Sequence, residues 1–168
     1  MKRLTAMRTA DRRVPGVRQI YRIVARRDAE SPFSGARCRQ GGRWSTPGVH
    51  LAYASASPGG ALLEYLAHGG GRASTPMVLV CARLPAARWP AVTDPPPGWR
   101  ARPYSPRIRA LGDEWINAGA SLALLVPSAL AEEEWNVLVN PAHPHFARLH
   151  VLAIHPLVVD PRLRSPHA

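Results

Sequence analysis

Arginine is the residue type in this 168-residue chain that most directly indicates chemistry. Lys and Arg together number 22 against 11 Asp and Glu, giving a formal net charge of +11, and the one lysine is Lys2. The planar fork of arginine binds phosphate oxygens in pairs, which suits nucleic acid and dinucleotides equally well. The arginines are scattered and show no recognition-helix or zinc-finger pattern. The charge therefore predicts an anionic partner and leaves its class open.

Other residue types that can take part in catalysis are spread along the chain, and each of them also has an ordinary structural role. A glutamate such as Glu64, on a helix surface, is by default solvated. A tyrosine such as Tyr53, in a strand, usually packs with its hydroxyl satisfied. Ser128 follows a proline, and Asn140 precedes one, both of which are common turn signals. None of these residues indicates a site when taken alone.

The strands that must position these residues are predicted from apolar runs and alternation. In the first strand, alternation places Arg22 on the opposite face from Tyr21 and Ile23. In the second, Val49 and Leu51 share a face with the tyrosine that follows them. The predicted strands span 19–24, 49–54, 77–84, 122–126, 135–139 and 149–154.

Two helices are predicted from cap signals. Ser57 caps the first, Pro58 suits its first turn, and the glycine run 69–71 ends it. The second begins with a cap at Ser105-Pro106 and ends at Gly119. Their apolar stripes, expected to face the core, are Leu62, Leu63 and Leu66 in the first helix, and Ile108, Leu111, Trp115 and Ile116 in the second.

Strands and helices mix without regular alternation, and the proline-rich segment 85–103 is an irregular connection. This pattern predicts a single α+β domain over residues 19–168. Residues 1–18 are basic, lack periodicity and are predicted to form an N-terminal arm.

Short motifs along this framework resemble, in their order, those of the RES family. The match runs from Tyr21 to Arg162, and Ser45 is a departure because the family more often has asparagine there. The motifs are Tyr21-Arg22, Gly41-Gly42-Arg43-Trp44, Tyr53, Leu63-Glu64, Gly112-Asp113-Glu114-Trp115, Val126-Pro127-Ser128, Asn136, Asn140-Pro141 and Asp160-Pro161-Arg162.

This resemblance implies a compact fold similar to that of ADP-ribosyltransferases and a toxin of a type II toxin–antitoxin system. The implied activity is degradation of NAD at the nicotinamide–ribose bond by water or phosphate, as a glycohydrolase or a phosphorylase. NAD would be the substrate, and no separate cofactor is expected. The functional positions that carry over are Arg22, Arg43, Tyr53, Glu64 and Ser128, with either Asn136 or Asn140 beside them.

The reaction suggests a role for each of these residues. Loss of neutral nicotinamide leaves an oxocarbenium-like ribosyl centre, which the Glu64 carboxylate would stabilise. Arg22 and Arg43 would bind the pyrophosphate. Tyr53 would stack on nicotinamide or donate a hydrogen bond, and Ser128 would bind ribose or phosphate. The catalytic candidates are therefore Arg22, Tyr53, Glu64 and Ser128, and the NAD-binding candidates are Arg22, Arg43, Tyr53, Asn136 and Asn140.

Two other functions stay open. An ADP-ribosyltransferase would use the same residues with a protein or nucleotide as the acceptor, and segment 85–103 is the candidate for target recognition. A non-catalytic nucleic-acid-binding protein would rely on the positive charge and show steeply salt-dependent affinity. In that protein Glu64→Gln would change nothing.

The remaining features concern compartment and partners. No apolar run approaches the roughly 20 residues needed to cross a bilayer, and the basic N-terminus lacks the apolar core of a signal peptide, so a cytoplasmic protein is expected. Neither the histidines nor Cys38 and Cys81 show metal-ligand spacing, so no metal is expected. The expected partners are an Xre-type antitoxin and, from the family, a second copy of the chain. DNA would be reached only through the antitoxin.

Overall fold

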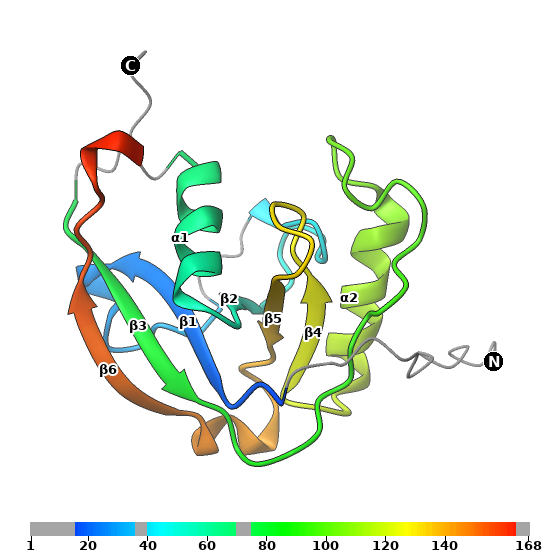
Figure 1. The fold of residues 1–168 in the computed structure, drawn as a ribbon. Helices are drawn as coiled ribbons and strands as arrows, with labels where there is room; N and C mark the ends of the chain where they lie inside the picture. Colours follow the sequence, from blue (N-terminus) through cyan, green and yellow to red (C-terminus); the bar gives the residue numbers. More distant parts are fainter. Residues whose placement is uncertain (1–15, 36–39, 70–74, 164–168) are drawn as a thin grey trace.

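The described strands form one sheet in the order β4-β5-β2-β1-β3-β6, and the helices pack against it (Figure 1). The computed structural model describes residues 16–35, 40–69 and 75–163. All pairings between these strands are antiparallel. The prediction of a single α+β domain is confirmed. The elements are β1 (Gln19–Ala25), β2 (Ala52–Ser55), α1 (Pro58–Ala67), β3 (Met77–Arg83), α2 (Pro106–Ala118), β4 (Ala123–Pro127), β5 (Trp135–Val139) and β6 (His150–Pro156).

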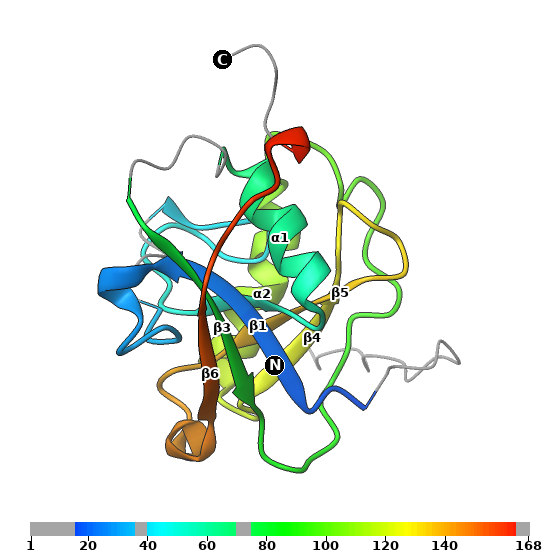
Figure 2. The same cartoon turned by 60° about the vertical axis from the view of Figure 1, so that its left-hand side comes forward.

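The sheet consists of two halves that meet between β1 and β2. β1 runs alongside β3 over its full length, from Gln19 opposite Arg83 to Ala25 opposite Met77. By contrast, the described register between β1 and β2 is the single pair Tyr21 and Ser55. In Figure 2, β6, β3 and β1 run across the front of β5 and β4. The two halves therefore diverge on either side of this one pairing.

The hydrophobic core has two clusters because β4 and β5 are buried on both faces. The first cluster contains Ile20 and Val80 from one half of the sheet and Leu125 and Val137 from the other, so it joins the two halves. The second cluster lies under α2. Burial of each large aliphatic side chain contributes about 1.5–3 kcal/mol. The buried members of the second cluster are Trp44, Leu51, Ile108, Trp115, Leu124, Val126 and Leu138.

Helix α1 begins as predicted but packs through different residues. The Ser57 Oγ accepts a hydrogen bond of 2.9 Å from the Gly60 backbone N–H, which is an N-cap. Its buried residues are Gly60 and Ala61, whereas Leu63 is 44% exposed. The predicted apolar stripe was therefore wrong at Leu63, because small residues let this helix approach the sheet closely.

Helix α2 packs as predicted but is not capped as predicted. Ile108 and Trp115 are buried, and the other two residues of the stripe pack against the second cluster. Ser105 makes no side-chain capping bond, so that part of the prediction was wrong. Pro106 instead supplies the fixed φ that suits a first turn. Gly119 ends the helix in a left-handed conformation, with a φ of 60°.

Most predicted strand boundaries agree with the structure within two residues, and the larger differences concern β2 and the N-terminal arm. β2 begins at Ala52, whereas Val49 precedes it and packs against the second cluster from a loop. Most of the predicted arm lies outside the described residues, but Val17 is buried in the first cluster and the Arg18 carbonyl accepts a hydrogen bond from Leu84 N. Within the described part of the chain, neither helix is long and apolar enough to cross a membrane.

Candidate active site

A cavity of about 740 Å³ lies beside α1, where the two halves of the sheet meet. Tyr21, Ser55 and Asn136 form a row across β1, β2 and β5, and all three line it. The loop before β2 and the segment before α2 complete the wall. The structure brings to this cavity five of the residues carried over from the family: Arg22, Arg43, Tyr53, Glu64 and Asn136.

A chain of hydrogen bonds fixes the carboxylate of Glu64, the single carboxylate among the described residues of the cavity lining. Asn136 Nδ2 donates to Glu64 Oε1 at 2.6 Å, and Ser55 Oγ donates to Asn136 Oδ1 at 2.9 Å. The second carboxylate oxygen of Glu64 lies 3.8 Å from His68 Nδ1, and 28% of the side chain is exposed. The carboxylate is thus held in place from the β5 side and can still contact a ligand.

Tyr53 fixes the loop that carries the Gly-Gly-Arg-Trp motif. Its hydroxyl accepts a hydrogen bond from Trp44 N at 3.2 Å and lies 3.0 Å from the Oγ of buried Ser45. A Cβ atom at Gly42 would lie 2.5 Å from the same hydroxyl, so this close approach requires glycine. The hydroxyl therefore holds the loop, and the ring lines the cavity.

Arg43 projects from this loop toward the segment before α2. Its Nη1 donates to the carbonyl oxygens of Trp99 and Ala101, and its guanidinium lies 4.9 Å from the centre of the Tyr104 ring. Burial lowers the pKa of Arg43, with the charge of Arg102 acting in the same direction. Arginine nevertheless keeps its positive charge at neutral pH, because its pKa lies far above neutrality.

Arg22 reaches the cavity because β1 leaves β2 directly before it. Tyr21 is the last residue of β1 in register with β2, and alternation places Arg22 on the core face, between buried Ile20 and Val24. The side chain is half-buried, its Nη1 is shielded from solvent, and it lines the cavity. The predicted placement of Arg22 opposite Tyr21 thus agrees with the burial pattern. Partial burial also raises the pKa of the Tyr21 phenol, next to Cys81.

Ser128 and Asn140 do not line the cavity. Ser128 is 3% exposed, and its Oγ accepts hydrogen bonds from Leu130 N at 3.1 Å and Ala131 N at 3.4 Å. Asn140 is 2% exposed and lies at the other end of β5 from Asn136. Its Oδ1 accepts a hydrogen bond from Ala142 N at 2.9 Å. Both residues stabilise turns, and of the two asparagines the structure places Asn136 at the cavity.

Ser55, Arg102 and Tyr104 are among the lining residues that were not predicted. Ser55 could be found only by knowing which residue of β5 lies opposite it. Arg102 and Tyr104 lie at the end of the proline-rich connection, where no periodicity relates them to the rest of the site. The sequence therefore carried no local signal for them.

Helix α2 holds the loop of the Gly-Gly-Arg-Trp motif in place. A Cβ atom at Gly112 would lie 1.8 Å from the Trp44 carbonyl oxygen, so the helix and the loop are in direct backbone contact. Asp113 Oδ1 accepts a hydrogen bond of 3.0 Å from Thr46 N, and Arg109 Nε donates one of 3.0 Å to the Gly42 carbonyl. The Gly-Asp-Glu-Trp motif thus positions the loop that bears Arg43.

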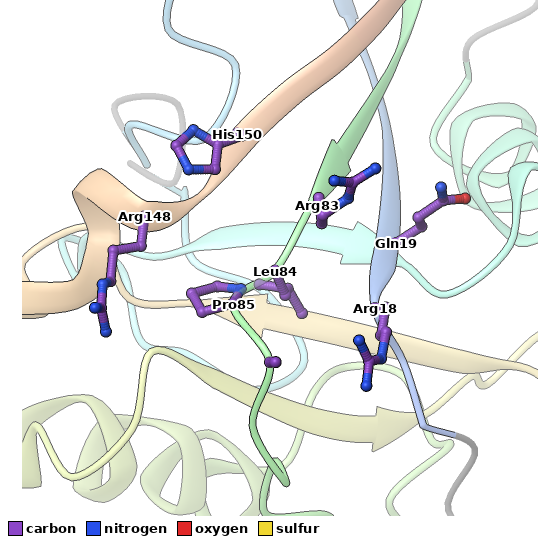
Figure 3. Close-up of a pocket in the computed structure, with 8 residues that line it drawn as sticks. Arg18, Gln19, Arg83, Leu84, Pro85, Arg148 and His150 are labelled. Carbon is purple, nitrogen blue, oxygen red and sulfur yellow. The ribbon is translucent and has the colours of Figure 1, made fainter.

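A second hollow, of about 600 Å³, lies at the far end of β1, β3 and β6 (Figure 3). Its basic lining residues are Arg18, Arg83, Arg148 and His150, and the described part of the lining contains no carboxylate. In Figure 3 the Arg83 side chain points away from those of Arg18 and Arg148. This hollow therefore lacks the acidic group that the first cavity holds. Among the described residues, no three His, Cys, Asp or Glu side chains gather as a metal site.

Fold and site together define an α+β protein with an arginine-lined cavity that contains a fixed carboxylate. The fold is similar to that in the crystal structure of the M. tuberculosis MbcT–MbcA toxin–antitoxin complex, with a TM-score of 0.69 and 15% identity. That likeness covers 84% of each chain.

Sequence comparison identifies the family. Residues 19–160 match the RES domain. The chain is 33% identical over 151 residues to Toxin Res of Yersinia enterocolitica, covering 86% of this chain and 99% of that one. It is 37% identical over 130 residues to Toxin Res of Pseudomonas putida, covering 73% and 86%. A third relative, Prs ADP-ribosylating toxin of Sphingobium sp., is 33% identical over 138 residues, covering 78% and 86%. The chain belongs to the RES-domain toxin family.

Proposed function

We propose that this protein is the toxin of a toxin–antitoxin pair and that it degrades NAD by cleaving the nicotinamide–ribose bond. The observation that carries the proposal is the Glu64 carboxylate, fixed by Asn136 at 2.6 Å in a cavity lined by Arg22 and Arg43. A negative charge beside several positive ones suits a substrate with a cationic ring and an anionic pyrophosphate. At about 740 Å³ the cavity falls within the size range of ligand pockets.

The proposed reaction assigns a task to each part of the cavity. The bond from the ribose carbon to the nicotinamide nitrogen breaks, and its electron pair goes to nicotinamide, which leaves neutral. Glu64 stabilises the positive charge that develops on the ribose. A water molecule adds to that carbon and loses a proton to solvent, giving ADP-ribose. The arginines neutralise the pyrophosphate and hold the substrate in register with Glu64.

Ser128 takes no direct part in this proposal. Its hydroxyl is buried and bonded to the turn that follows it, while its neighbours Pro127 and Ala129 line the cavity. We therefore assign it the task of shaping this wall. Tyr53 contributes its ring to the cavity and its hydroxyl to the loop of Arg43.

Transfer of ADP-ribose to a macromolecule is a second candidate function. Its support is the Sphingobium relative, whose name describes an ADP-ribosylating toxin and which is 33% identical to this chain. Both functions need the same bond cleavage and differ only in the acceptor, so the cavity serves either one. Simple nucleic-acid binding ranks last, because it gives the fixed carboxylate no task.

An antitoxin of the Xre type is the proposed partner. The support is the class of the solved neighbour, a toxin–antitoxin complex with a similar fold. A free NAD-degrading enzyme would deplete its own cell, so the antitoxin is proposed to close the cavity, and DNA is reached only through the antitoxin. A cytoplasmic location, where NAD is present, and a homodimer belong to the same proposal.

The direct test is to incubate the purified protein with NAD and separate the products by chromatography. Hydrolysis releases nicotinamide and ADP-ribose, whereas phosphorolysis requires phosphate and gives ADP-ribose 1″-phosphate. Transfer instead leaves the label of adenine-labelled NAD on protein or nucleotide added as acceptor. No nicotinamide release under any of these conditions would rule out cleavage of NAD as the function.

A further inference from the structure

The segment that leads into α2 brings an arginine and a tyrosine to the same cavity. Arg102 and Tyr104 both line it, and Arg102 Nη2 donates to the Tyr104 hydroxyl at 3.2 Å. The Tyr104 ring is also approached by the guanidinium groups of Arg43, Arg102 and Arg109, at 4.9, 5.5 and 5.5 Å from its centre. Such contacts hold cations over the face of an aromatic ring. Tyr104 thus gathers positive charge at this end of the cavity.

Arg43 is only partly available to bind a phosphate. Its Nη1 is committed to the carbonyl oxygens of Trp99 and Ala101, so Arg43 anchors the segment next to Arg102. A bidentate phosphate contact needs two N–H groups of one guanidinium aimed at the same group. Arg43 therefore has fewer donors to offer than its charge alone suggests.

Arg102 is differently placed. Among the described residues no carboxylate forms an ion pair with Arg102, whereas Arg100, on the same segment, pairs with Glu132 at 2.7 Å and does not line the cavity. Among the described residues, the cavity lining contains the arginines Arg22, Arg43 and Arg102 and the single carboxylate of Glu64, so this lining carries an excess of positive charge. The charge of Arg102 is available to an anionic ligand.

Resting on the proposed function, we propose that Arg102, oriented by Tyr104, binds the pyrophosphate of the ADP-ribose part of NAD. Arg43 then acts mainly by fixing the segment that carries Arg102. This arrangement sets the direction of the substrate: pyrophosphate toward Arg102, and the nicotinamide–ribose bond at Glu64. A dinucleotide bound in the opposite direction would place its adenosine half, which has no cationic ring, at the carboxylate.

The test compares Arg102→Gln with Arg100→Gln, a matched change two residues away and outside the cavity. Calorimetry with ADP-ribose as the probe should show at least about tenfold weaker binding for Arg102→Gln, equivalent to ~1.4 kcal/mol, and a change within about twofold for Arg100→Gln. In kinetics with NAD, Arg102→Gln should raise KM by a similar factor and leave kcat within about twofold. Cleavage of nicotinamide riboside, which has no pyrophosphate, should be equal in the two variants.

Arg102→Lys and thermal melting complete the design. Lysine keeps the charge and loses the fork, so its ADP-ribose affinity should lie between those of the wild type and Arg102→Gln. Equal melting temperatures show that the segment is intact. Equal ADP-ribose affinity in Arg102→Gln and Arg100→Gln would overturn the subsite while leaving NAD cleavage in place. If the proposed function is wrong, the wild-type protein will release no nicotinamide from NAD. If the wild-type protein does not bind ADP-ribose, the subsite is overturned as well.

Discussion

At the scale of single residues, the site depends on polar side chains that fix one another. From the sequence alone, a glutamate on a helix such as Glu64 is expected to be solvated. In the structure, the hydrogen bond from Asn136 gives its carboxylate a defined orientation. Asn136 is itself held by Ser55. Motif order in the sequence indicated Glu64 and left two asparagines open. Only the strand register, with Ser55 opposite Asn136, separates Asn136 from Asn140.

Asn136→Ala tests this chain of hydrogen bonds. A hydrogen bond to a charged group contributes roughly 1.5–3 kcal/mol, so we expect kcat/KM for NAD to fall by about 10- to 100-fold. The matched control is Asn117→Ala, because Asn117 is exposed near the end of α2, and it should keep kcat/KM within about twofold. Initial-rate kinetics of nicotinamide release measures both. Unchanged activity in Asn136→Ala would show that the carboxylate needs no support from β5.

At the scale of elements, two helices position the site from different sides. Helix α1 carries Glu64. Its N-cap is Ser57, whose Oγ accepts a hydrogen bond from Gly60 N and donates one of 2.8 Å to Glu134 Oε2. Helix α2 holds the loop of Arg43 through Gly112 and Asp113. Cap and periodicity signals were sufficient to predict both helices. They could not predict that small residues of α1 face the sheet.

The two serines that precede these helices give a matched pair for α1. Ser57→Ala removes a capping bond and should cost about 1 kcal/mol of unfolding free energy. Ser105→Ala removes no such bond and should cost less than about 0.5 kcal/mol. Urea denaturation followed by circular dichroism measures both values. Equal costs for the two variants would contradict the assignment of Ser57 as the cap.

Two helical glycines provide the corresponding pair for α2. Gly112→Ala places a methyl group against the Trp44 backbone and should destabilise the protein by at least about 1–3 kcal/mol. At ~2–4 °C per kcal/mol, its melting temperature should fall by roughly 2–12 °C. In Gly59→Ala the nearest atom to the new Cβ, Ser57 Oγ, lies 3.9 Å away, so this variant should be neutral or slightly stabilising. Calorimetric melting of both variants decides the matter, and a stable Gly112→Ala would refute the backbone contact.

At the scale of the whole molecule, the sequence predicted the fold class but not the cavity. Strand alternation, buried runs and turn signals predicted nearly all the secondary structure and the α+β class. The cavity itself could not be predicted, because it depends on where β1 leaves β2 and on how segment 99–104 folds back over Arg43. Both depend on long-range packing, which produces no periodic pattern in the sequence.

The proposed antitoxin leads to a prediction at this scale. If the antitoxin closes the cavity, nicotinamide release should fall in proportion to added antitoxin and stop at the stoichiometric point. Subsequent addition of the Glu64→Gln protein, which keeps the surface of the wild type, should capture antitoxin and restore activity. Retention of full activity in a complex shown to be intact by gel filtration would contradict closure of the cavity.

The most direct test of the account is NAD consumption by Glu64→Gln. Glutamine can keep the contact with Asn136 through its own amide oxygen and removes only the negative charge. Loss of transition-state charge stabilisation should lower kcat by about 10²–10³-fold or more, with the melting temperature unchanged. Glu114→Gln, an exposed glutamate on α2, should retain full activity. If Glu64→Gln consumes NAD as fast as the wild type, the carboxylate in this cavity does not carry the chemistry, and the central claim fails.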